Sequence, residues 1–303
     1  MLQLILVTVV TAATPLFLAA LGELVAERSG VLNLGVEGMM VIGAVVGFAA
    51  AYMTGSTLVG AVAGTLAGTL MALLFGLLTV VVPVSQVAAG LALTIFGLGL
   101  SGLIGSAFVG LKRDPAPHLS IPGLSDLPLV GRLVFGEDYF VYAALLLALA
   151  VSFVLRRTRA GLVIRAVGDN HSSAHALGLP VRRVRLLAVL FGGACAGLGG
   201  AYLSLAYTPF WSPEMTAGRG WIALALVVFS SWRPWRALAG AVLFGGATVL
   251  QLQAQAFGLG LPGQFMSAIP YLATILVLVL LSLKRRAGSV APAMLGTAFV
   301  PDR

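Results

Sequence analysis

The sequence predicts an all-α fold, a polytopic membrane helix bundle with about nine spans and eight or ten as alternatives. Composition is the first observation, because 59% of the 303 residues are hydrophobic and only 9% are charged. An ordinary soluble domain has about 25% charged residues. The second observation is a run of 74 residues, from Gly38 to Leu111, that contains no Asp, Glu, Lys or Arg. Each spanning helix needs roughly 20 apolar residues, so this run holds about three spans.

Windows without charge place the spans in order along the chain. No Lys or Arg precedes the first, at 2–21, so we expect a retained span rather than a cleaved signal peptide. The long run divides at Thr54–Ser56 and at Pro83–Gln86. The window 220–232 would be about 20 Å long as a helix, too short to cross unless residues 215–220 extend it. The expected spans lie near residues 2–21, 38–53, 57–82, 86–110, 139–155, 186–206, 220–232, 237–256 and 267–283.

Charged residues predict the orientation of a single transmembrane domain, residues 1–303. Seven of the 16 arginines lie in the loop 156–185, and three basic residues, 284–286, follow the last apolar run. The positive-inside rule places both segments in the cytoplasm. The loop 112–138 has three bases and four acids, a net charge of 3 − 4 = −1, and is expected outside the membrane. The side of the N-terminus depends on whether Pro83–Gln86 is a turn or a break at membrane depth.

Missing motifs exclude several chemistries. Lys112 and Lys284 both follow Leu, so the Gly-Lys-[Ser/Thr] of a P-loop is absent. His171 and His175 share a helical face without a third metal ligand nearby, which favours a solvated pair over a metal site. The net charge of +8 follows the loops rather than a nucleic-acid-binding module. We therefore predict a non-catalytic protein with no cofactor, no metal and no nucleic-acid partner.

Small residues recur at every fourth position in two of the expected spans. In lipid, such faces let helices approach each other closely, so they predict a tight bundle without identifying a function. They are Gly60, Gly64 and Gly68 in one span and Gly192, Ala196 and Gly200 in another.

The segment 23–38 is unusual, because three acids, one Arg and one Asn lie between two apolar spans. We expect Gly35 and Gly38 to interrupt the helix. For residues 23–28 two interpretations stay open. Either Glu27 and the following arginine lie in water at an interfacial turn, or the backbone is broken at membrane depth and lines a cavity.

Asn33 and Glu37 favour a cavity. Glu37 directly precedes a long uncharged run with no polar spacer, and a buried carboxylate is costly unless water, a partner or a solute meets it. We expect both residues near a solute-accessible cavity, together with Ser85 and Gln86. In this arrangement Asn33 would bind solute, whereas Glu37 would instead accept from exposed N–H groups and hold the broken backbone. Gln86 has the alternative of a plain helix N-terminal residue at an interface.

The arginine-rich loop carries its own helix pattern. Gly168, Asp169 and Asn170 can cap an N-terminus, the two turns His171–Leu177 follow, and Gly178 suits the position after the helix. Pro180 prevents continuation. Two interpretations stay open. The short capped helix docks a cytosolic partner, or the segment is an ordered basic loop with no partner.

Four segments resemble the membrane permease subunits of bacterial ABC importers of the branched-chain amino acid, ribose and nucleoside class. Residues 27–44 (ERSGVLNLGVEGMMVIGA) resemble that signature, and the EGMM after NLG is closest to the nucleoside and simple-sugar permeases. Residues 165–178 (RAVGDNHSSAHALG) resemble the cytoplasmic segment that contacts the ATPase. Residues 85–93 (SQVAAGLAL) and 215–225 (MTAGRGWIALA) also agree. The resemblance covers roughly residues 20–285, and Asp169-Asn170 stand where Glu-Asn is common.

The resemblance implies a half-transporter in the bacterial inner membrane. A second permease subunit, homologous or identical, would complete the pathway, cytosolic ATPase subunits would bind below, and an extracytoplasmic solute-binding lipoprotein would deliver solute. Coupling to the ATPase would involve Gly168, Asp169, Asn170, Ala174 and Gly178. The mechanism would be alternating access.

Alternatives remain for the transported solute and for the class of transporter. A nucleoside is the expected solute, with Phe96 or Trp221 walling the base and Asn33, Ser85 and Gln86 as polar groups; branched-chain amino acids or simple sugars are the alternatives. A different class is a secondary transporter driven by an ion gradient. It would need an intramembrane ionisable relay, and the spans after Glu37 hold essentially no acids.

Overall fold

The computed structural model describes residues 2–119, 135–256 and 291–300, with isolated positions at 268, 272, 275, 276 and 279. Within these residues every regular element is a helix, as predicted. The first half contains α1 (Leu2–Arg28), α2 (Val36–Thr54), α3 (Thr57–Gly76) with a π-turn (Leu77–Val81), and α4 (Gln86–Gly105) with a 3₁₀ turn (Ser106–Phe108). The second half contains α6 (Tyr139–Arg157), α7 (Arg159–Asp169), α8 (His171–Ala176), α9 (Val181–Tyr202) with a π-turn (Leu203–Tyr207), α10 (Arg219–Phe229) and α11 (Pro234–Ala256).

Seven of the described helices are long and apolar enough to cross a membrane. Pro83–Gln86 holds a turn between two of them. The window 220–232 corresponds to α10, which has 11 residues, and residues 211–218 before it do not extend it as a helix. The expected span 267–283 lies outside the described residues apart from isolated positions. Large apolar side chains such as Leu66, Ile95 and Leu103 are more than half exposed, which suits a surface that faces lipid or another subunit.

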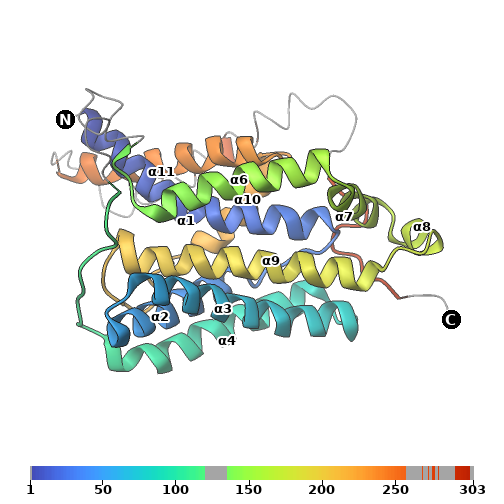
Figure 1. Ribbon diagram of the computed structural model, residues 1–303, viewed down its shortest axis with the longest axis horizontal. Helices are drawn as coiled ribbons and strands as arrows, with labels where there is room; N and C mark the ends of the chain where they lie inside the picture. Colours follow the sequence, from blue (N-terminus) through green and yellow to red (C-terminus); the bar gives the residue numbers. More distant parts are fainter. Residues whose placement is uncertain are drawn as a thin grey trace.

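Helix α9 is the centre of the bundle, between α1 on one side and α2 and α3 on the other (Figure 1). Glycines permit this close packing. A Cβ on Gly64 would lie 2.6 Å from the carbonyl oxygen of Gly43, and one on Gly68 would lie 2.6 Å from the Cα of Gly197. A Cβ on Gly60 would lie 2.6 Å from the carbonyl oxygen of Gly47. The prediction that the glycines of this span form a close-packing face is confirmed.

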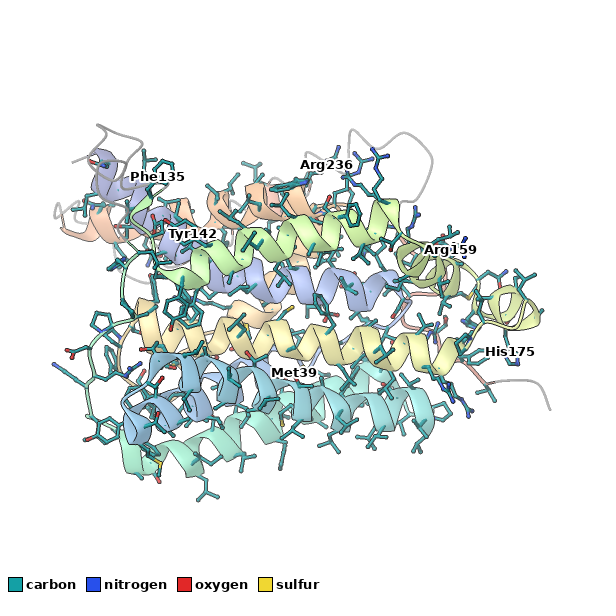
Figure 2. All side chains as sticks on the ribbon, in the orientation of Figure 1. Met39, Phe135, Tyr142, Arg159, His175 and Arg236 are labelled. Carbon is teal, nitrogen blue, oxygen red and sulfur yellow. The ribbon has the colours of Figure 1, made fainter. Side chains whose placement is uncertain are left out.

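The two ends of the bundle carry different segments. The loop 156–185 and residues 291–300 lie at one end, and the chain's N-terminus lies at the other (Figure 1). Arg159 and His175 mark the first end, and Phe135 and Tyr142 mark the second (Figure 2). The arginine-rich loop and residues 291–300 thus share one end of the bundle, whereas the basic residues 284–286 lie outside the described residues. Their cytoplasmic location stays a prediction.

Candidate solute pathway and coupling surface

The chain between α1 and α2 is a break in helical structure. Helix α1 continues to Arg28, and residues 29–35 then run back along the bundle before α2 begins (Figure 1). Gly30 has φ +89°, a left-handed conformation that glycine adopts without strain. Gly35 precedes α2, whereas Gly38 lies inside it, so the expectation that Gly38 interrupts the helix is wrong. A Cβ on Gly38 would lie 2.7 Å from the carbonyl oxygen of Leu93, so this glycine serves close packing with α4.

Glu37 joins the start of α2 to the start of α10. One carboxylate oxygen accepts from the Thr216 hydroxyl at 2.6 Å and from the Gly218 N–H at 2.9 Å. The other oxygen accepts from the Gly220 N–H at 2.6 Å. Helix N-termini leave N–H groups unpaired and carry partial positive charge, so a carboxylate there is doubly favourable. The chemistry predicted for Glu37, accepting from exposed N–H groups, is present, and it compensates a side chain only 4% exposed.

Asn33 is fully buried within the broken segment. Its Oδ1 accepts from the Gly35 N–H at 3.0 Å, and its Nδ2 lies 3.5 Å from the sulfur of Met39. The backbone N–H of Asn33 donates to Glu23 at 3.0 Å. In this conformation Asn33 shapes the turn before α2 and is closed to solvent.

Gln86, the first residue of α4, contacts the same segment, and Ser85 is the N-cap of that helix. The Gln86 Oε1 accepts from the Leu32 N–H at 2.8 Å, while its buried Nε2 has no hydrogen-bond partner among the described residues. Ser85 is exposed and caps α4 by accepting from the Ala88 N–H at 3.4 Å. The structure therefore brings Gln86 next to the segment that carries Asn33. A solute-accessible cavity at these residues stays a prediction.

Phe96 and Trp221 lie on two of the helices that pack against α2. Phe96 on α4 is 51% exposed and Trp221 on α10 is 37% exposed, and both helices pack against α2. Gly97 and Gly220 allow this approach, because a Cβ on either would lie within 2.7 Å of α2 backbone. The two aromatic rings thus face outward beside the α2–α10 junction.

The acids of α1 are buried inside a continuous helix. Glu23 and Glu27 are each 1% exposed, so the interpretation that puts Glu27 in water is wrong, and the backbone break begins only after Arg28. The Glu27 carboxylate accepts from the indole N–H of Trp232 at 2.7 Å. Trp232 is 205 residues away, and no local pattern marks this partner.

Helix α8 confirms the capped helix predicted at His171–Leu177 in the arginine-rich loop. Asn170 accepts from the Ser173 N–H at 2.9 Å, and Leu177 follows the last helical residue. Gly178 has φ +81° with open space around its Cβ position. Ala174 is the buried residue of α8, whereas Leu177 is 81% exposed.

Gly168 and Asp169 are not part of the α8 cap, contrary to the prediction, because they end α7, a helix that the sequence analysis missed. Gly168 lies against the α1 end, where an added Cβ would meet the carbonyl group of Arg28. Asp169 is exposed. Helix α7 is amphipathic. The sequence analysis assigned its arginines to a positive-inside loop and therefore missed the helical periodicity.

Residues 291–300 complete the surface around α8. The Met294 N–H donates to the carbonyl of Gly168 at 2.9 Å, and the Gly296 N–H donates to Gly30 at 3.2 Å. Phe299 is 7% exposed and packs with Val167, Ala174 and Val181. Its ring lies 5.2 Å from that of His171 and 5.3 Å from that of His175. Sequence reasoning did not anticipate this docked segment, which has no periodic pattern.

Arg185 ties these parts together from the first turns of α9. Although only 1% exposed, it donates to the carbonyls of Ser29 at 3.2 Å and Thr297 at 2.8 Å. Its remaining nitrogen lies 3.1 Å from His171 Nδ1. One buried guanidinium therefore connects the broken segment, the C-terminal segment and the predicted coupling helix.

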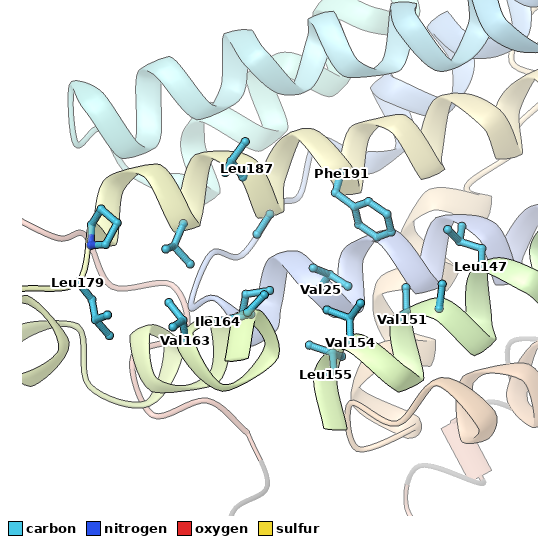
Figure 3. Close-up of a pocket in the computed structure, with 15 residues that line it drawn as sticks. Val25, Leu147, Val151, Val154, Leu155, Val163, Ile164, Leu179, Leu187 and Phe191 are labelled. Carbon is cyan, nitrogen blue, oxygen red and sulfur yellow. The ribbon is translucent and has the colours of Figure 1, made fainter. Parts of the chain in front are cut away.

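A separate groove of about 580 Å³ lies between α1, α6, α7 and α9 (Figure 3). Its walls are apolar side chains, including Val25, Val151, Leu155 and Phe191. A site for a polar solute needs a few placed hydrogen-bonding groups. This groove lacks them and is not a candidate for the solute site.

The exposed apolar helices, the buried helix break and the half-length α10 define a membrane transport protein with a non-helical segment inside the bundle. The family described as branched-chain amino acid transport system / permease component matches residues 5–283. The chain belongs to this family.

Three relatives share most of their length with the chain. It is 44% identical to the putative glucose ABC transporter permease protein TsgC13 of Haloferax volcanii, over 89% of this chain and 88% of the relative. It is 32% identical to the guanosine ABC transporter permease protein NupQ of Bacillus subtilis, over 91% of each. It is 30% identical to the nucleoside ABC transporter permease protein NupC of Lactococcus lactis, over 100% of this chain and 98% of the relative.

Proposed function

We propose that this protein is the transmembrane permease subunit of an ATP-driven importer and moves solute by alternating access. Family membership carries the proposal, and the bonded junction of Glu37 with the start of α10 supplies an element that can change with state. Alternating access needs two arrangements whose relative stability a partner biases. ATP hydrolysis belongs to a separate chain, in keeping with the missing P-loop.

A nucleoside is the first candidate solute. NupQ and NupC, whose names state guanosine and nucleoside transport, each cover at least 91% of this chain. The exposed rings of Phe96 and Trp221 suit a flat base, and Asn33, Ser85 and the unpartnered amide of Gln86 suit ribose hydroxyls. Since Asn33 is closed off in this conformation, its contact with solute requires residues 29–35 to open.

A simple sugar is the second candidate. The observation that favours it is the 44% identity to TsgC13, whose name states glucose. A sugar shares the hydroxyl groups of ribose and has no aromatic base, so it would use the polar groups and depend less on Phe96 and Trp221.

The second permease subunit is expected to be a different chain. Bacillus subtilis has two guanosine ABC transporter permease proteins, NupQ and NupP, and both resemble this chain, at 32% and 26% identity. TsgC13 and TsgB13 of Haloferax volcanii form a similar pair, at 44% and 27%. A heterodimer of permeases, with cytosolic ATPases and an extracytoplasmic binding lipoprotein, is the proposed assembly.

The proposed coupling surface is α8 with Gly168, Asp169, Asn170, Ala174 and Gly178 around it, facing the ATPase in the cytoplasm. The loop 112–138 would face outward. Labelling of single cysteines in a Cys195→Ser background tests this orientation. A cysteine at position 175 should react with an impermeant reagent only from the cytoplasmic side, and reaction from outside contradicts the assignment.

Uptake of labelled guanosine, glucose and leucine by cells carrying the whole system tests the function. We expect guanosine uptake that disappears when the ATPase is inactivated, and an increase in the apparent KM when Asn33 is replaced by Ala. Glucose uptake alone would favour the second candidate. Uptake that persists without the ATPase and follows an ion gradient would contradict the importer class.

A further inference from the structure

Four arginines surround a cavity at the end of the bundle that carries α7 and α8. The cavity has a volume of about 300 Å³ and lies between the ends of α1 and α6, helix α7 and the turn from α10 to α11. Its lining comprises Arg28, Ser152, Leu155, Arg156, Arg165, Trp232, Arg233 and Pro234. No carboxylate of the described residues lines it.

The turn between α10 and α11 is held firmly at this cavity. The guanidinium of Arg28 donates to the carbonyl of Trp232 at 3.4 Å and lies 5.9 Å from the centroid of its ring. Ser231 and Trp232 both have positive φ, +52° and +54°, a conformation that costs free energy in residues other than glycine. Contacts with α1 therefore fix a strained turn, and Arg233 is placed beside the cavity as a result.

The charge balance around the cavity is positive. The charges of Arg165 and Arg233 act on Arg28, as does the opposite charge of Asp169. Among the described residues Glu27 is a further acid beside the turn, and its carboxylate accepts from the indole N–H of Trp232. The side chains of Arg156 and Arg233 have no hydrogen bond or ion pair within the part of the chain that the structure describes. Four like charges around one cavity repel each other, which an anion would relieve.

We propose that this arginine pocket binds a phosphate group, carried by an anionic lipid of the adjoining leaflet or by a soluble molecule. Guanidinium groups match phosphate oxygens with paired N–H donors. Basic pockets between membrane helices on the cytoplasmic side bind anionic lipid headgroups. Leu155 also lines the apolar groove of Figure 3, so the pocket borders a surface open to acyl chains.

The bound group would link several elements that meet at the helix break. Arg28 ends α1 immediately before the broken segment 29–35, and Arg165 lies on α7, whose end contacts that segment. Arg233 lies in the turn between α10 and α11, and the start of α10 is hydrogen-bonded to Glu37. The ligand would thus hold together the elements around the helix break, whatever solute the protein carries.

Binding is tested on the purified full-length protein by native mass spectrometry and thermal unfolding. The probes are phosphatidylglycerol, phosphatidylcholine and inorganic phosphate. The test variant is the double substitution Arg156→Gln with Arg233→Gln. The control is Arg182→Gln with Arg183→Gln, two exposed arginines of α9 that do not line the pocket. We expect phosphatidylglycerol to bind and raise the unfolding temperature, and the test variant to bind it about tenfold more weakly.

Each outcome decides the proposal. Protection by phosphatidylglycerol alone, lost in the test variant and kept in the control, supports a lipid headgroup. Equal protection by inorganic phosphate supports a soluble phosphate ligand of the same pocket. Equal loss in both variants, or binding of phosphatidylcholine as tight as phosphatidylglycerol in the wild type, overturns the site. The comparison of phosphatidylglycerol with phosphatidylcholine on the wild-type protein needs no variant, so the proposal stays testable even if a variant misfolds.

Discussion

The carboxylate of Glu37 accepts a hydrogen bond from the backbone N–H of Gly220 at 2.6 Å, so the N-terminal ends of α2 and α10 meet at one side chain. A Cβ on Gly220 would lie 2.5 Å from the Cα and N of Glu37, so the backbones are close as well. A small change at either residue should therefore affect both helices.

Replacing Glu37 with Gln should destabilise this junction. Glutamine keeps the shape but exchanges one accepting oxygen for an NH₂ donor, so at least one of the Thr216, Gly218 and Gly220 donors is left unpaired. The expected loss is about 1–3 kcal/mol, measured as a lower unfolding temperature and reduced ATPase coupling. Glu214→Gln, at an exposed position in the preceding loop, is the control and should behave as wild type. An unchanged Glu37→Gln protein would contradict the proposed role.

Replacing Gly178 with Val should weaken transport without preventing membrane insertion. The Cβ would meet nothing within 4 Å, so the cost comes from the φ of +81°, which a β-branched residue adopts poorly. Gly178→Asn is the matched control, because Asn tolerates the left-handed region. Uptake and stimulated ATPase activity should fall in the Val variant and largely recover in the Asn variant. Equal activity in the wild type and both variants would contradict the proposed role of α8 in coupling to the ATPase.

Replacing Phe299 with Ala should loosen the predicted coupling helix. The ring is buried against Ala174, Val167 and Val181, and loss of a buried Phe costs about 3–5 kcal/mol. Hydrogen exchange of residues 168–178 should become faster, because their packing partner is removed. Val300→Ala is the control, since Val300 is 66% exposed and should leave exchange unchanged.

Stability should fall as pH rises from about 4.5 to about 7, because of Glu137. Burial, then the charge of Asp138, raises the pKa of Glu137 to about 7. The native state holds a proton that the unfolded state releases near 4.5, so the free energy of unfolding decreases between that pH and about 7. Neither carboxylate oxygen has a hydrogen-bond partner within the described ranges. Glu137→Gln should flatten this part of the unfolding temperature's pH profile, and an unchanged slope would contradict the assignment.

Local patterns predicted much of the fold. Charge-free windows located the helices because lipid excludes charge, and Asn170 with Gly178 marked α8 because capping depends on adjacent residues. Glu37 was singled out because a carboxylate beside a long uncharged run needs a partner. The identity of that partner, the start of α10, did not follow from the sequence near it.

Features set by distant contacts were missed or misread. Glu27 was placed in water in one interpretation because Trp232, which pairs with it, is far along the chain. Gly38 was read as a helix break, although its function is to admit α4. The role of Arg185 depends on Ser29, Thr297 and His171, which meet only in the folded chain. Composition and periodicity do not reveal contacts between residues that are far apart in the sequence.

The docking of residues 291–300 on α7 and α8 has a consequence for the order of synthesis. Gly168 and Arg185 leave the ribosome more than a hundred residues before Met294 and Thr297, which bond to them. During that interval the carbonyl of Gly168 and one side of the Arg185 guanidinium lack their final partners. The surface around α8 is therefore finished late, so nascent chains that stop before residue 291 would be inserted in the membrane without the completed surface that we propose for the ATPase.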